Sequence, residues 1–439
     1  MISEQSIFQR KSTLVLVVFL VIRSVLMFIT IDYPAGGLTL DSKNYIELSE
    51  VIRFEGNYQN PNGAEDLRRP PVYPAFLAIF QSKVGLHQSL VSLTQLLLVS
   101  ASSLIVLWML ARLGYHSAGI AAGWLIAMSP NINLWSLTIM SEVLFTFLLV
   151  LSLALISKYI ARPSTGTVIV SGVVMGLATL TRPIGLIVVA LWMWILVTAV
   201  LRKRSSVLKI STAVWFAVGC ALVIFPWMVR NAAVHHTFSV SDIGTHTLES
   251  FNFAVVLSEA ESISRNDATY RLGELGGTWD QFRWLIVEYP LSFIRSQVAG
   301  VGRVIWGTEI TRWASVAGLQ EWAGFGVFRY LRAGDLRSAL VNVFETVRKP
   351  SELALLLVYM ISVFHTLALF ILSVFGIIPV KEPDVRRRML TVLCTASALC
   401  LILISGAAGQ ARFRVPAEPF VAVIAGFGWW ELESKRNTR

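Results

Sequence analysis

The chain has 439 residues, of which 55% are hydrophobic and only 15% are charged, and its formal net charge is +10. Soluble domains carry about 25% charged residues, so this composition excludes an ordinary soluble protein. The cations lie mainly in short turns between apolar runs instead of on one soluble face, which argues against a nucleic-acid partner.

Apolar runs of roughly 17 to 25 residues recur along the chain, each long enough to cross about 30 Å of hydrocarbon as a helix. They lack the alternation of a transmembrane β-barrel, so the sequence predicts an all-α, polytopic helical membrane protein with about ten spans. The first run is longer than a signal-peptide core and is expected to be a retained helix. The predicted spans are residues 12–31, 90–110, 117–134, 140–160, 167–181, 184–201, 207–228, 352–378, 388–406 and 416–431.

Clusters of basic residues fall in every second loop, which is typical of the cytoplasmic side of a cell-membrane protein. Both termini are therefore expected in the cytoplasm. The extracytoplasmic side then receives a first loop at 32–89 and a long fourth segment at 229–351, within a single domain spanning 1–439. Interfacial helices are expected in both. In the long segment, apolar residues recur at helical spacing over 281–306, interrupted at Pro290.

The first loop carries the clearest candidate for chemistry. Asp41 lies near the expected membrane surface, where a carboxylate beside so much apolar sequence is a candidate functional residue. The alternative is that Asp41 only caps an amphipathic helix over residues 42–54. Tyr45 follows one turn later and would share its face. Further on, Arg68 and Arg69 precede two prolines. They would contact lipid headgroups or, as adjacent guanidiniums, bind a phosphate.

Further cations occur in short outer turns, where the positive-inside trend disfavours them. Arg182 lies between two predicted spans, and Arg412 and Arg414 lie between the last two. Arg230 is expected at the same membrane level, and Glu142 joins it there. These arginines would either extend to lipid phosphates or hold an anionic substrate group, and the second explanation accounts better for several of them together.

Several other classes of site lack their sequence signature. The chain has no Gly-rich phosphate loop, which argues against a P-loop ATPase. Its histidines lack the spacing of a zinc helix and no Asp-x-Asp pair is present, so no metal or other cofactor is expected, although a divalent metal is not excluded. The three cysteines all fall in apolar runs, so no disulfide framework is indicated.

Six short motifs follow one another along the chain: Asp41-Ser42-x-x-Tyr45, Arg69-Pro70-Pro71-x-Tyr73-Pro74, Ser141-Glu142, Leu180-Thr181-Arg182-Pro183, Pro226-Trp227-Met228-Val229-Arg230-Asn231 and Ala411-Arg412-Phe413-Arg414-Val415-Pro416-x-x-Pro419. In this order they resemble the GT-C class of integral-membrane glycosyltransferases, in the branch related to protein O-mannosyltransferases and the aminoarabinose transferases of lipid A. No large soluble extracytoplasmic domain is expected at the carboxyl end, so the acceptor clues seen in longer relatives are absent.

The resemblance implies a polyprenyl-phosphate sugar donor used on the extracytoplasmic face, with a lipid, glycan or protein acceptor. Asp41 would take the proton from the acceptor hydroxyl in an inverting transfer. The substrate-binding residues would be Tyr45, Arg68, Arg69, Tyr73, Glu142, Arg182, Arg230, Arg412 and Arg414.

Two other functions remain open. The first is a transporter or flippase of a lipid-linked anion, in which the same arginines bind without chemistry. Inverted repeats and paired broken helices would favour a transporter, and the sequence shows neither. The second is a polysaccharide polymerase or ligase, which also uses lipid-linked sugars.

Overall fold

The computed structural model describes residues 11, 14, 17–23, 25, 38–59, 66–201, 209–319, 325, 330, 334–377 and 385–437. The predicted span at 12–31 therefore lies largely outside the described residues. Most of the other predicted spans correspond to single helices.

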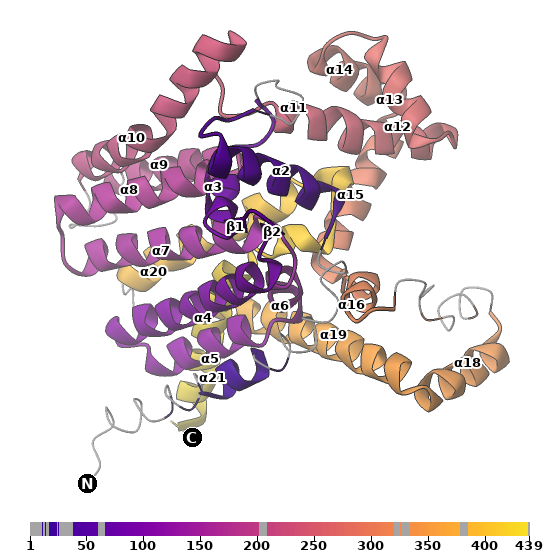
Figure 1. Ribbon diagram of the computed structural model, residues 1–439. Helices are drawn as coiled ribbons and strands as arrows, with labels where there is room; N and C mark the ends of the chain where they lie inside the picture. Colours follow the sequence, from indigo (N-terminus) through magenta and orange to yellow (C-terminus); the bar gives the residue numbers. More distant parts are fainter. Residues whose placement is uncertain are drawn as a thin grey trace.

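The body of the molecule is a bundle of long helices (Figure 1). Among the described residues, four helices, α4, α7, α10 and α19, are long and apolar enough to cross a membrane. This confirms a multi-pass helical membrane protein, while the count of about ten spans stays a prediction. The bundle contains α4 (Gln88–Arg112), α5 (His116–Ala127), α7 (Glu142–Ala161), α8 (Thr165–Thr179), α9 (Gly185–Leu201), α10 (Ile210–His235), α19 (Pro350–Ile377), α20 (Val385–Leu403) and α21 (Glu418–Asn437).

The predicted span at 117–134 is broken into two helices. α5 ends at Ala127, and the short α6 (Pro130–Ser136) begins after two intervening residues. Ser129 is the N-cap of α6, and its hydroxyl accepts a hydrogen bond from the backbone N–H of Ile132 at 3.1 Å. Pro130 favours the first position of a helix and disfavours helical backbone in the residue before it, which explains the break.

The first loop contains α2 (Leu40–Phe54), α3 (Val72–Ala78) and a small hairpin of β1 (Gln81–Ser82) and β2 (Gly85–Leu86) that the sequence did not predict. Near the other end of the chain, two 3₁₀ turns, η3 (Gly406–Ala408) and η4 (Ala411–Arg414), connect α20 to α21.

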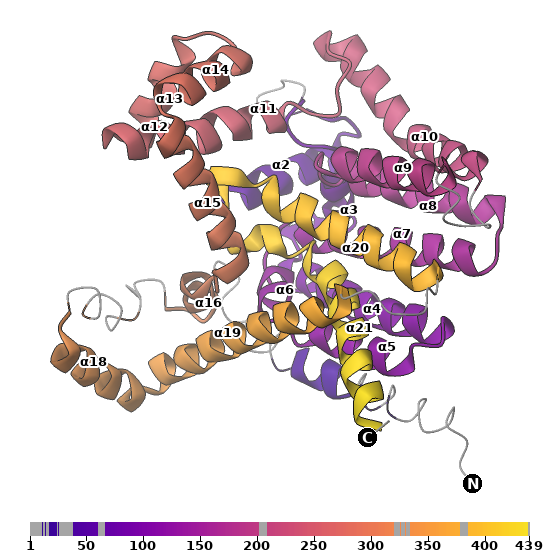
Figure 2. The same ribbon diagram turned by 180° about the vertical axis from the view of Figure 1, so that it is seen from behind.

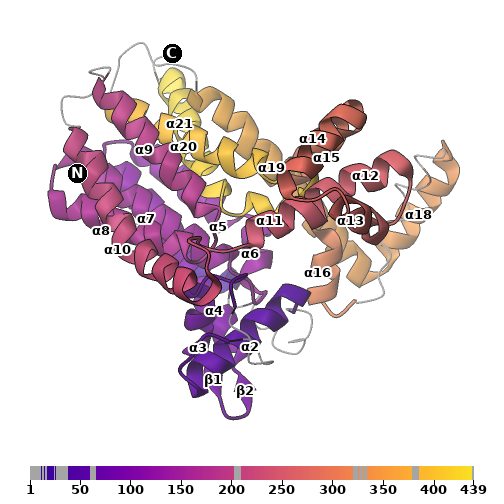
Figure 3. The ribbon, with the colours of Figure 1, turned by 90° about the horizontal axis from the view of Figure 1, so that it is seen from above.

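The long segment at 229–351 is also helical. After α10, it contains α11 (Ile243–Thr247), the π-helix η2 (Leu248–Phe253), α12 (Ala254–Glu261), α13 (Arg265–Gly273), α14 (Thr278–Glu288), α15 (Pro290–Trp306), α16 (Ile310–Val316) and α18 (Leu336–Arg348). The helix break at Pro290 is confirmed. Figures 1 and 3 show α12, α13 and α14 set apart from the bundle, and Figure 2 shows α15 running from this group toward α16.

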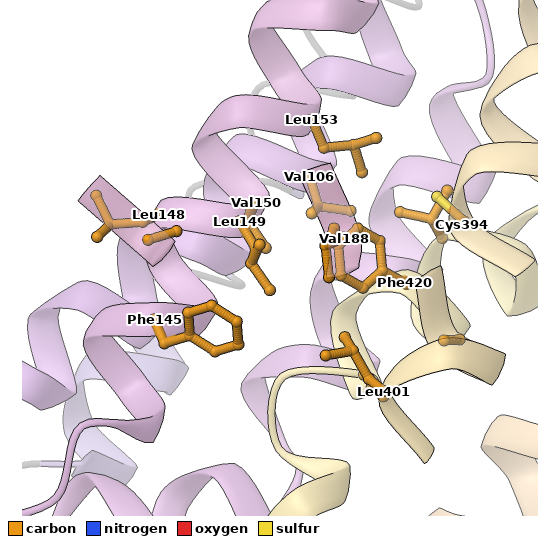
Figure 4. Close-up of a cluster of buried hydrophobic side chains, with 14 of the residues drawn as sticks. Val106, Phe145, Leu148, Leu149, Val150, Leu153, Val188, Cys394, Leu401 and Phe420 are labelled. Atoms are coloured by element: carbon orange, nitrogen blue, oxygen red, sulfur yellow. The ribbon is translucent and has the colours of Figure 1, made fainter. Parts of the chain in front are cut away.

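The core of the bundle is centred on α7, which is apolar on all sides and therefore buried. Figure 4 shows its residues Phe145, Leu149 and Leu153 among side chains of α4, α9, α20 and α21, including Val188 and Phe420. Because α7 begins at Glu142, this packing also fixes one predicted site residue at the end of a rigid helix.

Helices α19 and α21 approach each other through two glycines. A Cβ atom on Gly428 would lie 1.9 Å from the carbonyl oxygen of Leu372, and one on Gly376 would lie 1.9 Å from that of Ile424. Small residues at such positions let the backbones of membrane helices come close together.

We expect Gly428→Ala to lower the apparent melting temperature of the purified protein, because the added methyl group forces the two backbones apart. Overpacking of this kind typically costs about 1–3 kcal/mol. Gly166→Ala in α8 is the matched control, since nothing lies within 4 Å of a Cβ atom there. A melting temperature for Gly428→Ala equal to that of the control would contradict this packing.

Candidate active site

Asp41 lies in the first turn of α2 between two guanidinium groups. Nη2 of Arg69 is 2.7 Å from Oδ1 of Asp41, and Nη1 of Arg412 is 3.4 Å from Oδ2. The arginines come from the Arg-Pro-Pro turn before α3 and from η4, so three distant parts of the sequence meet here. The Asp41 side chain is 35% exposed, which leaves it open to a reacting group.

The charge state of Asp41 follows from this setting. Burial by itself raises the pKa of Asp41, but the guanidiniums of Arg69 and Arg412 more than offset that effect and hold the pKa below its ordinary value. Asp41 is therefore a carboxylate at neutral pH, able to accept a proton.

Asp41 is not the N-cap of α2, so the alternative that it serves as the cap is wrong. Thr39 is the cap: its hydroxyl accepts the N–H of Ser42 at 3.1 Å, and the hydroxyl of Ser42 accepts the N–H of Thr39 at 2.9 Å. The Ser42 hydroxyl also donates to the carbonyl of Ile139 at 2.9 Å, which fixes α2 against the segment before α7. The carboxylate of Asp41 is thus not needed for capping.

Two hydrogen bonds fix the backbone of Arg69. Its N–H donates to Oδ1 of Asp66 at 2.7 Å, and its carbonyl accepts the hydroxyl of Tyr58 at 2.6 Å. The guanidinium lies over the ring of Tyr45, 4.9 Å from the centroid, which favours a cation. Pro70 and Pro71 then lead directly into α3. These contacts aim the Arg69 side chain at Asp41.

Tyr45 connects the Asp41–Arg69–Arg412 group to a second polar group, which consists of Ser141, Glu142 and Arg182. Nη1 of Arg69 donates to the Tyr45 hydroxyl at 3.5 Å, and this hydroxyl lies 3.3 Å from Oγ of Ser141. Arg182 donates to Ser141 at 3.3 Å and forms an ion pair with Oε1 of Glu142 at 2.6 Å. The structure therefore brings the predicted residues Asp41, Tyr45, Arg69, Glu142, Arg182 and Arg412 into one connected polar cluster.

Tyr73 lies behind this cluster. Its side chain is fully buried, its hydroxyl donates to Oε1 of Gln95 at 3.0 Å, and its ring meets the ring of Tyr45 edge-on with 4.9 Å between centroids. Tyr73 therefore supports Tyr45 from the core.

Arg230 and Arg68, both predicted to bind substrate, form hydrogen bonds that involve the backbone of the first loop. Arg230 donates to the carbonyls of Tyr58 and Asp66, both at 3.1 Å, and so restrains the residues before Arg69. Arg68 is exposed, and its carbonyl accepts the hydroxyl of Ser241 at 2.5 Å.

Arg414 is buried away from Asp41, with 2% of its side chain exposed. Its Nε donates to Oε1 of Glu418 at 2.8 Å, and its Nη1 donates to the carbonyl of Val304 at 3.0 Å and to that of Ile305. These are carbonyls at the end of α15 that have no partner within the helix. Arg414 thus anchors the turn that carries Arg412.

Sequence reasoning missed several residues that build the site. Glu418 accepts hydrogen bonds from Ser129 and from Nδ2 of Asn131, the latter at 3.0 Å, and Asn131 also donates to the carbonyl of Ala411 at 3.0 Å. An acid four residues after Arg414, at the start of an apolar span, was an available signal for this pair. Glu309, described below, carried no comparable signal.

Residues 68–229 match the protein family described as dolichyl-phosphate-mannose-protein mannosyltransferase. This segment includes Arg69, Glu142 and Arg182. Among curated proteins, no sequence matches the chain.

Two solved structures match most of this chain at low sequence identity. The apo oligosaccharyltransferase of Archaeoglobus fulgidus gives a TM-score of 0.50 at 15% identity, over 96% of this chain and 51% of that one. ArnT from Cupriavidus metallidurans, bound to undecaprenyl phosphate, gives 0.43 at 14% identity, over 96% and 78% of the two chains. The chain thus spans about half the length of the archaeal enzyme.

The family match covers the turn that carries Arg69, the start of α7 and the turn that carries Arg182, all of which contribute to the cluster around Asp41. Over residues 68–229 the chain is similar to the dolichyl-phosphate-mannose-protein mannosyltransferase family, and it is a membrane glycosyltransferase of the GT-C, mannosyltransferase-like type that its motifs resemble.

Proposed function

We propose that the enzyme moves a sugar from a polyprenyl-phosphate donor to an acceptor hydroxyl, with Asp41 as the general base. One observation carries this proposal: a solvent-accessible carboxylate lies between two arginines that still have unused donors. Within the described part of the chain, Nε of Arg69 and Nε of Arg412 are buried without a hydrogen-bond partner. Buried donors are costly unless they are satisfied, and phosphate oxygens of a donor would satisfy both.

In the proposed reaction, Asp41 takes the proton of the acceptor hydroxyl as that oxygen bonds to the anomeric carbon of the sugar. The bond from this carbon to the phosphate oxygen breaks on the opposite face, so the configuration inverts. The polyprenyl phosphate leaves with an additional negative charge. Arg69 and Arg412, with Arg182 in the adjoining group, would stabilise that charge as it develops.

Both substrates would meet the site from outside the cell. The alternation of basic loops supports cytoplasmic termini and an extracytoplasmic first loop that carries Asp41. The lipid tail of the donor would remain in the membrane beside the bundle. The acceptor would be a lipid, glycan or protein with a free hydroxyl.

We expect cysteines introduced at Asn62 and Ser262 to react with a membrane-impermeant thiol reagent in intact cells, and one at Ser205 to remain unlabelled. The background is favourable, because native Cys220 and Cys394 are buried and Cys400 is partly buried. Reversed labelling would place Asp41 in the cytoplasm and overturn the assignment of the active site to the outer face.

The acceptor class is accessible to mass spectrometry of envelope lipids, glycans and proteins from cells with and without the gene. The proposal predicts that one class loses a sugar and that the lipid-linked donor accumulates. A polymerase or ligase would instead change the length of a surface glycan. Unchanged glycosylation in every class would contradict the proposal.

A further inference from the structure

Glu309 has an unusual backbone conformation in the turn between α15 and α16. Its φ angle is +50°, in the left-handed region. Among the residues that the structure describes, His236 and Ser262 are the only other non-glycine residues with positive φ. Glycine adopts this conformation without steric cost, whereas a residue with a Cβ atom is strained there. The backbone of this turn would therefore favour glycine, so the side chain of Glu309 needs a separate explanation.

The carboxylate of Glu309 contacts the turn that carries Arg412. Its Oε1 accepts the backbone N–H of Arg412 at 3.3 Å. Burial raises the pKa of Glu309 above its ordinary value, and the backbone N–H groups of Arg412 and Ala411 and the positive charges of Arg412 and Arg414 offset this only in part. The side chain thus reaches across from the α15–α16 turn to hold the backbone of η4.

The first turn of α16, which follows Glu309, contacts the backbone that leads into α2. Nη2 of Arg312, three residues after Glu309, donates to the carbonyl of Leu38 at 3.1 Å. Leu38 directly precedes Thr39, the N-cap of α2. Glu309 and the first turn of α16 therefore contact both the backbone of Arg412 and the backbone just before α2, which carries Asp41.

We propose that Glu309 is a positioning residue, which fixes the backbone of η4 so that the guanidinium of Arg412 reaches Asp41. This inference rests on the proposed function of the Asp41–Arg412 pair. In the part of the chain that the structure describes, Glu309 forms its hydrogen bond with the backbone of Arg412, and no ion pair joins it to the guanidinium of Arg412. Its effect on the reaction passes through the position of Arg412.

The test compares Glu309→Gly with wild type in sugar transfer from a synthetic polyprenyl-phosphate sugar and in thermal stability. The glycine variant removes the carboxylate and relieves the left-handed strain. We expect an unchanged or higher melting temperature, together with a loss of about ten- to a hundredfold in kcat/KM, because small misplacements of catalytic groups have effects of this size. The matched control is Ser262→Gly, which relieves the same strain away from the site and should leave kcat/KM unchanged.

Two further measurements separate positioning from a general structural role. The acid limb of the kcat/KM profile should move to higher pH in Glu309→Gly, because Asp41 loses the nearby charge of Arg412. In an Arg412→Ala background, Glu309→Gly should cause little further loss. Glu309→Gln retains an oxygen that can accept the Arg412 N–H and should keep most of the activity.

Glu309→Asn provides a second route if the glycine variant does not fold, since asparagine tolerates the left-handed region and is one methylene shorter. Its kcat/KM should fall and its acid limb should move to higher pH, as in Glu309→Gly. Wild-type kcat/KM with an unmoved acid limb, or a full additional loss in the Arg412→Ala background, would overturn the inference. Failure of the wild-type enzyme to transfer sugar would instead overturn the proposed function on which it rests.

Discussion

Asp41→Asn is expected to reduce turnover of the purified enzyme by about 10²- to 10⁴-fold, the usual contribution of a general base. The amide has nearly the same shape as the carboxylate but cannot take the proton of the acceptor. Folding should be almost unaffected, because Thr39 caps α2 and partly exposed ion pairs contribute little to stability. The measurement is steady-state transfer by monodisperse protein, with its melting temperature recorded.

Glu47→Gln provides the control in the same helix. Glu47 is exposed, so the same chemical change there should leave turnover at the wild-type level. Wild-type turnover in Asp41→Asn would remove Asp41 from the chemistry and leave it as a partner of the two arginines.

The same carboxylate should set the acid limb of the pH profile. The pKa of Asp41 is lowered from the ordinary aspartate value of about 3.9. Asp41 is therefore a reactive carboxylate at every pH above that ordinary value, and it becomes protonated only at lower pH. Removing Arg412 takes away one of the two charges that lower the pKa, while the contribution of burial remains. Arg412→Ala should therefore move the acid limb to higher pH.

The second prediction with a large expected effect distinguishes Arg412 from Arg414, which lie in the same turn, η4. Arg412→Ala should lower kcat/KM about tenfold or more at an unchanged melting temperature, since hydrogen bonds to charged groups are worth about 1.5–3 kcal/mol. Arg412→Lys should be milder but still impaired, because lysine keeps the charge and loses the planar fork. The readout is donor-dependent transfer by folded variants.

Arg414→Ala should act on folding instead. It leaves Glu418 buried without its cation, and breaking such a buried pair typically costs about 3–5 kcal/mol. The yield of monodisperse protein and its melting temperature should therefore fall sharply. A stable Arg414→Ala variant that is inactive would instead place Arg414 at the donor, while a fully active Arg412→Lys variant would leave Arg412 without a specific phosphate contact.

Much of the architecture was predictable because membrane helices leave a strong local signal. Apolar length located α4, α7, α10 and α19, and Pro290 marked the break before α15. The arginines in outer turns were recognisable because they oppose the positive-inside trend. Of these arginines, Arg182 and Arg412 lie in the polar cluster around Asp41, together with Arg69, which the Arg-Arg-Pro-Pro run of the first loop indicated.

The sequence could not separate arginines that face a substrate from those that hold the backbone. Arg412 and Arg414 are two residues apart, yet one reaches Asp41 and the other is buried against Glu418 and the end of α15. That distinction depends on which segment packs behind the turn. The left-handed backbone of Glu309 is likewise a tertiary feature, because nothing in its local sequence requires a positive φ.

The central claim is most directly tested by incubating purified wild-type and Asp41→Asn protein with a synthetic polyprenyl-phosphate sugar and an extract of envelope lipids, glycans and proteins. The account predicts that the wild-type protein releases polyprenyl phosphate and forms a new glycosidic bond of inverted anomeric configuration, and that Asp41→Asn forms almost none. Movement of intact donor across a vesicle membrane without any new bond, as a transporter would produce, would contradict it.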